Sequence, residues 1–256
     1  MKILKFKKQT KDKYKLYLDN NSDITLYEDV IIKNNLLITK EISDELLEAL
    51  KKQNNNMYAY TLALGYISVK MRSIKEINDY LIKKGFNNLV ASKVSERLIK
   101  EGYLNDLKYA KSFINDSMNL TNKGPQKIKM ELIKYGVNKD IIESEIALID
   151  QRKVEEKLNK LIDKELKIKK GSQNAIKIKI INHFVNLGYS KDLVTSILMS
   201  KEITSDKSKL KKDYAKLYNK YKVKYNGQEL LYFISQKLYS KGYTASDIKE
   251  VLKEEN

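Results

Sequence analysis

The chain lacks cysteine and tryptophan, and it holds a single proline and a single histidine. Without cysteine there can be no disulfide, no thiolate zinc site and no thiol catalysis. Only nine glycines occur among 256 residues. Because helices disfavour glycine and proline, this scarcity favours long helical stretches. Long apolar runs and a signal-peptide core are also missing, so we expect a cytoplasmic protein that does not span a membrane.

Acidic residues are too few to balance the basic ones. The chain has 50 Lys and Arg against 33 Asp and Glu, which gives a formal net charge of +17. A protein this basic usually binds something acidic, such as nucleic acid, an anionic membrane surface or an acidic protein. A competing explanation is an A/T-rich genome, whose codons favour lysine and asparagine. Lysine far outnumbers arginine, which suits phosphate contacts better than bidentate recognition of bases.

The N-terminal region, residues 1–54, has a different pattern from the rest. Residues 13–18 alternate polar and apolar side chains, residues 19–22 have turn chemistry, and Ile24 and Leu26 resume the alternation. This pattern predicts a β-hairpin. Residues 28–37 and 44–53 are expected to be helical, the second helix with Ser43 or Asp44 as its N-cap. Asn54-Asn55-Asn56 is interpreted as a linker to the next module.

From residue 57 onward the sequence repeats. A glycine followed by an apolar residue recurs at intervals of 51, 52 and 54 residues, at Gly85-Phe86, Gly136-Val137, Gly188-Tyr189 and Gly242-Tyr243. Eight residues before each glycine stands isoleucine, and four before stands a large apolar residue. These positions share one face of a helix. We expect the glycine to end that helix in the left-handed conformation, and a third helix to follow.

The pattern therefore predicts three helices in each repeat of roughly 50 residues. A single domain of that size would be only marginally stable, but neighbouring repeats can stabilise one another. The expected fold is mainly α, with four tandem three-helix repeats forming an elongated curved array behind a small N-terminal β-hairpin and helix module. The expected boundaries are residues 1–54, 55–103, 104–150, 151–204 and 205–256.

The repeats resemble the RecX family. The resemblance covers residues 57–256 and rests on short motifs that occur in order. They are Arg72-Ser73-Ile74-Lys75-Glu76, Tyr80-Leu81, Lys84-Gly85-Phe86, Gly102-Tyr103-Leu104-Asn105-Asp106 with Tyr109-Ala110, and Lys123-Gly124-Pro125. A similar Lys170-Gly171-Ser172-Gln173 occurs in the third repeat. Two mild departures are Asn105, where aspartate is common, and Lys70, where arginine is common.

This resemblance implies a regulator of the RecA recombinase rather than an enzyme. Similar proteins bind the groove of the RecA filament on single-stranded DNA and mainly inhibit strand exchange, ATP turnover and co-protease activity. The implied setting is DNA repair, homologous recombination and the SOS response. The implied partner is the RecA filament, with direct contact to DNA phosphates left open, no membrane partner and a monomeric chain.

Several side chains are candidates for partner contact. Ser73 and Glu76 have the spacing of a capping box, whereas Arg72 is less easily explained by structure and is the best single candidate. At Lys123-Gly124-Pro125 the free amides of a helix start could receive a phosphate. The proposed contact residues are Arg72, Lys75, Lys84, Lys123, Gly124, Lys127, Lys129, Lys169, Lys170, Lys177 and Lys179. Each lysine also fits an ordinary solvated helix face.

Catalytic, cofactor and metal residues are not predicted. His183 lies among apolar residues of a predicted helix and is expected to be partly packed, and no phosphate loop, dinucleotide glycine pattern or histidine metal motif occurs. The main alternative is a stand-alone basic nucleic-acid-binding protein, because three-helix units with a tight turn resemble helix-turn-helix modules. A weaker alternative is a nuclease that uses scattered carboxylates and a divalent metal.

Overall fold

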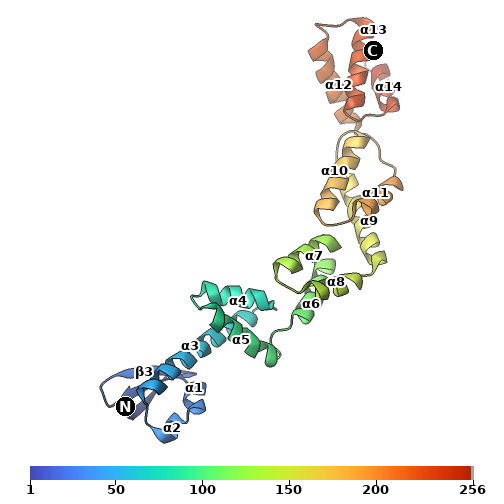
Figure 1. Cartoon of the computed structure of the whole chain (residues 1–256). Coiled ribbons are helices and arrows are strands. Elements are labelled where there is room, and N and C mark those ends of the chain that lie inside the picture. The colour runs from blue at the N-terminus through green and yellow to red at the C-terminus, as the bar shows by residue number, and fades with distance from the viewer. Residues whose placement is uncertain (255–256) are drawn as a thin grey trace. The chain divides into compact units, whose positions relative to one another are not determined.

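The computed structural model of the chain describes residues 1–254 (Figure 1). Within them lie three strands and fourteen helices. A small sheet occupies the N-terminal region, and everything that follows is helical. The mainly helical fold and the N-terminal β-structure predicted from the sequence are confirmed.

The N-terminal sheet has three antiparallel strands in the order β1-β2-β3, namely β1 (Ile3–Thr10), β2 (Lys13–Leu18) and β3 (Asp23–Tyr27). The predicted hairpin is β2–β3, in which Tyr14 pairs with Leu26 and Leu16 with Ile24. Strand β1 was not predicted. Its lysine-rich residues are mostly exposed and only Ile3 is buried, so it lacks the alternation of a half-buried strand.

Two of the helix predictions for this region are wrong in extent. Residues 28–37 form two short helices, α1 (Glu28–Lys33) and α2 (Leu36–Thr39), because Asn35 between them adopts the left-handed conformation. Helix α3 (Asp44–Ile67) begins after the predicted N-cap Ser43 but continues through the predicted linker at residues 54–56. Asn54 is used inside this helix, where its side chain accepts a hydrogen bond from the Tyr27 amide and donates one to Thr25 O.

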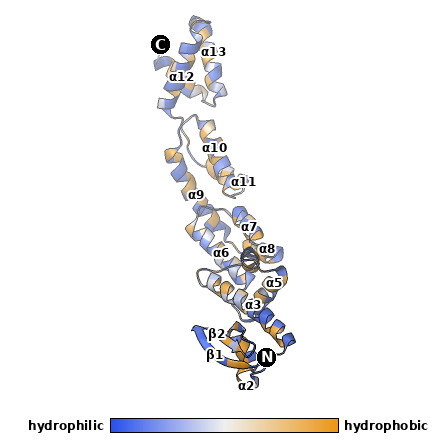
Figure 2. Cartoon of the chain, turned by 90° about the vertical axis from the view of Figure 1, so that its left-hand side faces the viewer, coloured by the Kyte–Doolittle hydropathy of each residue, from blue (hydrophilic) through white to orange (hydrophobic). Residues whose placement is uncertain are grey.

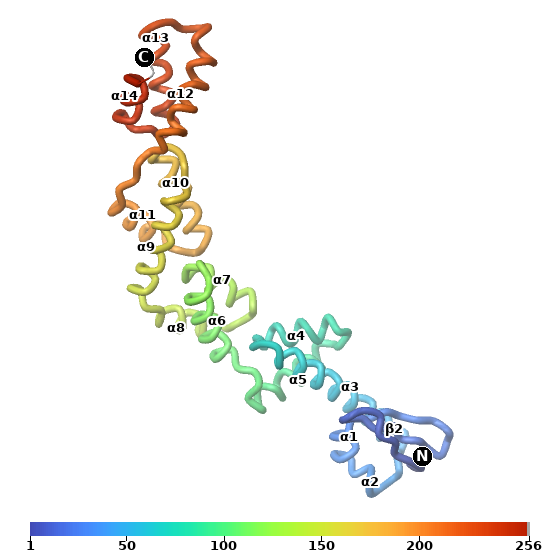
Figure 3. Tube along the Cα trace, turned by 180° about the vertical axis from the view of Figure 1, so that it is seen from behind, coloured from blue at the N-terminus to red at the C-terminus, as the bar shows by residue number. Residues whose placement is uncertain are grey.

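The predicted repeats each contain three helices. The first uses the C-terminal part of α3. The others are α4 (Ile74–Lys83), α5 (Asn88–Lys100), α6 (Asp106–Leu120), α7 (Pro125–Lys134), α8 (Lys139–Ala147), α9 (Gln151–Ile168), α10 (Gln173–Asn186), α11 (Lys191–Met199), α12 (Lys207–Tyr221), α13 (Gly227–Ser240) and α14 (Ala245–Glu254). Figure 3 shows the last three packed side by side. The repeat boundaries remain a proposal that these helices fit.

The periodic apolar positions form the repeat cores. The isoleucines eight residues before each glycine are fully buried: Ile77, Ile128, Ile180 and Ile234. The apolar residues four before and one after each glycine are buried too. Most helices carry both apolar and polar residues, as the colours of Figure 2 show. This arrangement is the amphipathic pattern that the spacing predicted.

The glycine that follows each middle helix is left-handed, as predicted. The φ angles are +93° at Gly85, +77° at Gly136, +91° at Gly188 and +85° at Gly242. Such angles place an ordinary side chain too close to the following carbonyl oxygen. The middle helix is thus stopped at the same place in all four repeats.

The chain divides into two compact units. The first unit comprises residues 1–110 and 133–139, and the second comprises residues 111–132 and 140–256. The second repeat therefore contributes to both units. Among the residues that the structure describes, no helix is long and apolar enough to cross a lipid bilayer.

The glycine pattern predicts unequal costs for the same substitution. A Cβ at Gly85 would meet no atom within 4 Å, whereas a Cβ at Gly188 would collide with the amide nitrogen of Lys127. We expect Gly85→Ala to lower the free energy of unfolding by about 1–2 kcal/mol through backbone strain alone. We expect Gly188→Ala to add about 1–3 kcal/mol of overpacking to that strain. Urea denaturation followed by circular dichroism measures both, and equal losses would contradict the prediction.

Candidate partner-binding surfaces

Neighbouring repeats are connected by a hydrogen bond at an equivalent position. In the last three repeats, the residue that precedes the glycine at the end of the middle helix accepts a hydrogen bond, through its backbone carbonyl, from the start of the middle helix of the previous repeat. In the first unit, the Ser73 hydroxyl donates to Tyr135 O at 2.7 Å. In the second unit, the Gly124 amide donates to Leu187 O at 2.7 Å and the Ser172 hydroxyl to Lys241 O at 2.6 Å. We call these three contacts the joints.

The joint at Gly124 lies at the helix start where the sequence predicts a phosphate site. The Gly124 amide is engaged by Leu187 O, and the next free amide of the helix, on Gln126, donates to Gly188 O at 3.0 Å. Gly124 is buried, and a Cβ there would lie 2.6 Å from the backbone of Gly188. These amides therefore bind the third repeat, and glycine is needed for its close approach.

Arg72, the leading candidate for partner contact, is held inside the first unit. Its guanidinium lies 3.7 Å from the centroid of the Tyr66 ring and 3.3 Å from Glu76, and only 11% of its side chain is exposed. Tyr66 in turn stacks on Tyr80, with ring centroids 4.1 Å apart. Arg72 Nε is buried without a hydrogen-bond partner. The side chain thus stabilises the region around the first joint.

The predicted capping box is confirmed, and a residue of the next repeat also caps the same helix. The Glu76 amide donates to the Ser73 hydroxyl, and Glu76 accepts from the Ser73 amide. Asp106 accepts from the Ile74 amide at 3.0 Å, so it caps α4 rather than its own helix, where Asn105 is the cap. Burial raises the pKa of Asp106, although its hydrogen bond from Ile74 opposes the rise. Burial, together with Glu76, also raises the pKa of Tyr109.

Two predicted residues, Lys75 and Lys84, line a pocket of about 630 Å³ in the first unit. Lys75 pairs with Asp79 at 2.9 Å, and the ammonium of Lys84 lies 5.6 Å from the Tyr80 ring. Sequence reasoning missed the rest of this first-unit pocket, which includes Tyr66, Tyr80, Lys83, Lys134 and Tyr135. The lining also includes Glu76 and Asp79, which pair with Arg72 and Lys75. The remaining lysines and the rings suit an acidic or an aromatic partner.

The other predicted lysines do not form one site. Lys123 pairs with Glu131 at 2.6 Å and Lys129 with Glu143 at 3.5 Å. Lys169 pairs with Glu165 at 2.9 Å. Lys127, Lys170 and Lys179 are exposed and Lys177 is half-buried. Residues two apart on a helix, as in 127 and 129 or 177 and 179, point in different directions.

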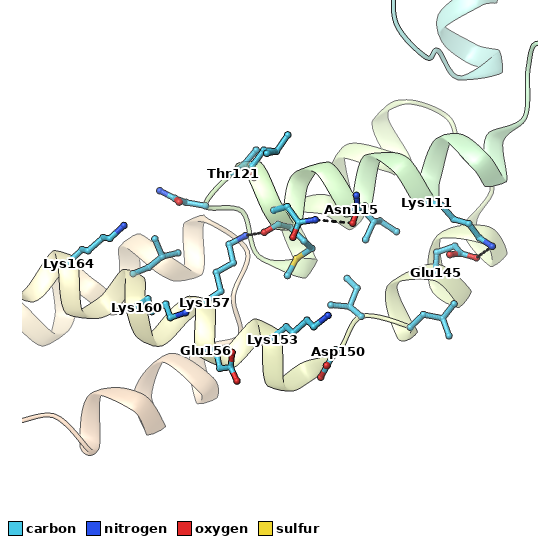
Figure 4. Close-up of a pocket in the computed structure, with 18 residues that line it drawn as sticks. Lys111, Asn115, Thr121, Glu145, Asp150, Lys153, Glu156, Lys157, Lys160 and Lys164 are labelled. Carbon is cyan, nitrogen blue, oxygen red and sulfur yellow. Dashed lines mark hydrogen bonds and ion pairs between the residues drawn. The ribbon is translucent and has the colours of Figure 1, made fainter.

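The second unit contains a larger basic groove that the sequence analysis missed. Four lysines of α9, namely Lys153, Lys157, Lys160 and Lys164, lie along a cavity of about 660 Å³ (Figure 4). The facing wall is α6 with the loop after it, and it carries Lys111, Asn115, Asn119, Thr121 and Asn122. We call this feature the lysine groove. Its signal was the 4-3-4 spacing of lysines on one helix, rather than local density of charge.

Lys157 differs from the other lysines of the groove. Its ammonium donates to Met118 O at 2.7 Å and to Lys123 O at 3.3 Å, so it binds the carboxyl end of α6 (Figure 4). Burial lowers the pKa of this ammonium. Its role is to hold α9 against α6, which leaves the remaining lysines to face solvent.

Within residues 1–254, no three His, Cys, Asp or Glu side chains come together as a metal site would require. His183, expected to be partly packed, is in fact exposed. Its ring lies edge-on to that of Phe184, with the two ring centroids 4.9 Å apart.

The joints lead to a prediction that separates their two roles. Ser172 caps α10 and also donates to Lys241 O, whereas Ser190 only caps α11. We expect Ser190→Ala to cost about 1 kcal/mol of unfolding free energy. Ser172→Ala should cost more and should also speed amide hydrogen exchange in residues 238–244, because the fourth repeat loses its anchor. Unchanged exchange in that segment would show that the hydroxyl acts as a cap alone.

Known proteins are similar to this chain in sequence and in fold. The family model described as RecX, first three-helix domain matches residues 59–98, and the model of the second three-helix domain matches residues 105–144. "Regulatory protein RecX" of Streptococcus uberis is 36% identical over 259 residues, and that of Streptococcus sanguinis is 33% identical over 262. In both comparisons 99% of each chain is covered.

Two solved structures of RecX proteins have a fold similar to that of this chain. A crystal structure of regulatory protein RecX has a TM-score of 0.68 at 23% identity, covering 77% of this chain and 98% of that one, which shows the shared fold. RecX from Lactobacillus salivarius has a TM-score of 0.53 at 28% identity, covering 57% and 96%. These relatives are named regulatory proteins rather than enzymes. With two family models matched and full-length relatives above 30% identity, this chain belongs to the RecX family.

Proposed function

We propose that this chain binds the RecA filament on single-stranded DNA and regulates it, mainly by inhibiting its ATPase, recombinase and co-protease activities. The observation that carries the proposal is membership of the RecX family over nearly the full length of the chain. DNA repair and homologous recombination are the processes in which such a regulator would act.

The physical character of the chain supports a binding role. The DNA strand within such a filament is a polyanion, and this chain has a net charge of +17. Its two basic surfaces belong to different compact units of the chain, so several weak contacts can act together and raise the overall affinity. Neither surface needs a strong individual site.

The first-unit pocket is the proposed protein-contact surface. Lys83, Lys84 and Lys134 are exposed there and have no acidic partner among the described residues. Lys75, by contrast, packs its side chain against Gly136, so it also supports the first joint. The exposed Lys127, Lys170 and Lys179 remain further proposed contacts, whereas Arg72 and Gly124 have internal roles.

The proposal is tested by the single-stranded-DNA-dependent ATPase rate of the cognate RecA, with this chain added below stoichiometry. We expect strong inhibition that survives a large excess of competing bare DNA. Inhibition that the competitor abolishes would favour the alternative, a stand-alone nucleic-acid-binding protein whose positive charge titrates the DNA. No inhibition of the ATPase rate would contradict the proposal.

The surface is tested in the same assay. Replacing Lys83, Lys84 and Lys134 with alanine should raise the concentration needed for half-inhibition severalfold, because three exposed cations are lost from one pocket. A matched control replaces Lys212, Lys216 and Lys220, three exposed lysines of α12, and removes the same charge. Equal effects of the two variants would assign the loss to net charge and not to the pocket.

A further inference from the structure

We infer that the lysine groove of the second unit binds the phosphate backbone of a single nucleic-acid strand. The inference rests on the proposed function and deepens it, because it assigns a surface of this chain to the nucleic acid within the complex. The first-unit pocket is a separate surface of the first unit. The two assignments therefore fail independently.

The first argument is the regularity of the charge. Lys153, Lys157, Lys160 and Lys164 are spaced 4, 3 and 4 residues apart, and Lys167 continues the series. At 3.6 residues per turn these positions fall within an arc of about 80° on α9. Because Lys157 donates into the fold, the cations left for a ligand are Lys153, Lys160, Lys164 and Lys167, which at 1.5 Å per residue lie about 10, 6 and 4.5 Å apart along the helix. A row of cations on one helix face suits a polyanion that carries one charge per nucleotide.

The second argument is that the charge is available. Lys153, Lys160 and Lys164 form no ion pair with the residues that the structure describes. Most acidic side chains of the groove already have partners inside the chain, so they do not neutralise these lysines. Glu145 pairs with Lys111 at 3.8 Å, and Asp150 accepts from the Arg152 amide as the N-cap of α9, which leaves Glu156 as the remaining carboxylate of the lining.

The facing wall favours nucleic acid over an acidic peptide. It presents three amide side chains, Asn115, Asn119 and Asn122. Asn119 donates to Asn115 Oδ1 at 2.9 Å, which leaves further donors and acceptors on both, whereas the Thr121 hydroxyl donates to Ser117 O at 2.7 Å and serves the fold. Amides both donate and accept hydrogen bonds, so they can contact bases and sugars as well as phosphates. Leu120 and Leu148, also in the lining, are 80% and 74% exposed. An exposed apolar rim beside a row of cations suits a strand whose bases are unstacked and accessible.

The groove is also held in shape before any ligand arrives. Lys157 binds α9 to the end of α6 through Met118 O and Lys123 O. The Tyr189 hydroxyl donates to Lys123 O at 3.4 Å, and the Gly124 joint fixes the following residues. A preformed surface loses little conformational entropy when it binds.

The test is binding of the whole chain to a short labelled oligothymidylate, measured by fluorescence anisotropy across a salt series. The groove variant carries Lys153→Ala, Lys160→Ala and Lys164→Ala and keeps Lys157, which supports the fold. We expect at least tenfold weaker binding and a slope of log K against log salt that is smaller by about 2, since each lost phosphate contact on a single strand contributes about 0.7. The control variant, with alanine at 212, 216 and 220, should stay within about threefold of the unmodified chain because its lysines lie outside the groove.

Two results would overturn the inference. One is an equal loss in the control variant, which would make the binding a matter of net charge. The other is competition by poly-glutamate as effective as that by unlabelled oligothymidylate of equal charge, which would assign the groove to an acidic polypeptide. The ATPase assay separates this inference from the proposed function. If the groove variant binds oligothymidylate normally while the chain inhibits RecA, the groove assignment is wrong and the regulatory role stands. If the groove variant loses binding while RecA is unaffected by the chain, the groove assignment stands and the regulatory role is wrong.

Discussion

The contact on which this structure depends is the approach of one helix start to the turn that ends another helix. In each joint the carbonyl before a left-handed glycine reaches the first residues of the preceding middle helix. Gly136, Gly188 and Gly242 are approached so closely that a Cβ would collide with the neighbouring repeat. Gly85 has the same φ and no preceding three-helix repeat, and its Cβ position is empty. The glycine therefore ends the helix in every repeat and permits the joint in three of them.

The joints determine where the chain can bind anything else. Helix N-termini attract anions because their first amides lack partners. At Gly124 and Gln126 those amides are already satisfied by the next repeat, and at Ser73 and Ser172 the cap residue serves both its own helix and the joint. Positive charge available for a partner must then lie on helix faces and in the spaces beside the joints. Both the first-unit pocket and the lysine groove are of this kind.

The repeat cores could be predicted from the sequence because their signal is local and periodic. Isoleucine, a large apolar residue and glycine recur at fixed spacing, and every one of those isoleucines is fully buried. The joints could not be predicted, because their partners lie 62 residues apart for Ser73 and Tyr135 and 69 apart for Ser172 and Lys241. Nothing in one repeat specifies which carbonyl of the next will meet it.

The candidate residues show the same limit. The sequence showed no structural role for Arg72. Its guanidinium contacts the Tyr66 ring, six positions earlier, and the Glu76 carboxylate, four positions later, and only folding brings the three side chains together. Lys123 and Lys129 were chosen from a dense cluster, yet each is matched by a glutamate from the folded second unit. The lysines of α9 are less dense in the sequence but share one face. Helical phase was thus the better guide to a basic surface than local charge density.

The choice of lysine over arginine bears on how such surfaces work. A lysine ammonium is a flexible point charge, whereas a guanidinium forms a planar fork that recognises particular base edges and carboxylates. In the proposed role, a row of lysines on α9 would provide attraction along a phosphate backbone with little preference for base sequence. This property would suit the proposed regulator, because its target would form wherever single-stranded DNA is exposed. Selectivity would then come from the protein surface of the filament, while the groove contributes affinity that depends on ionic strength.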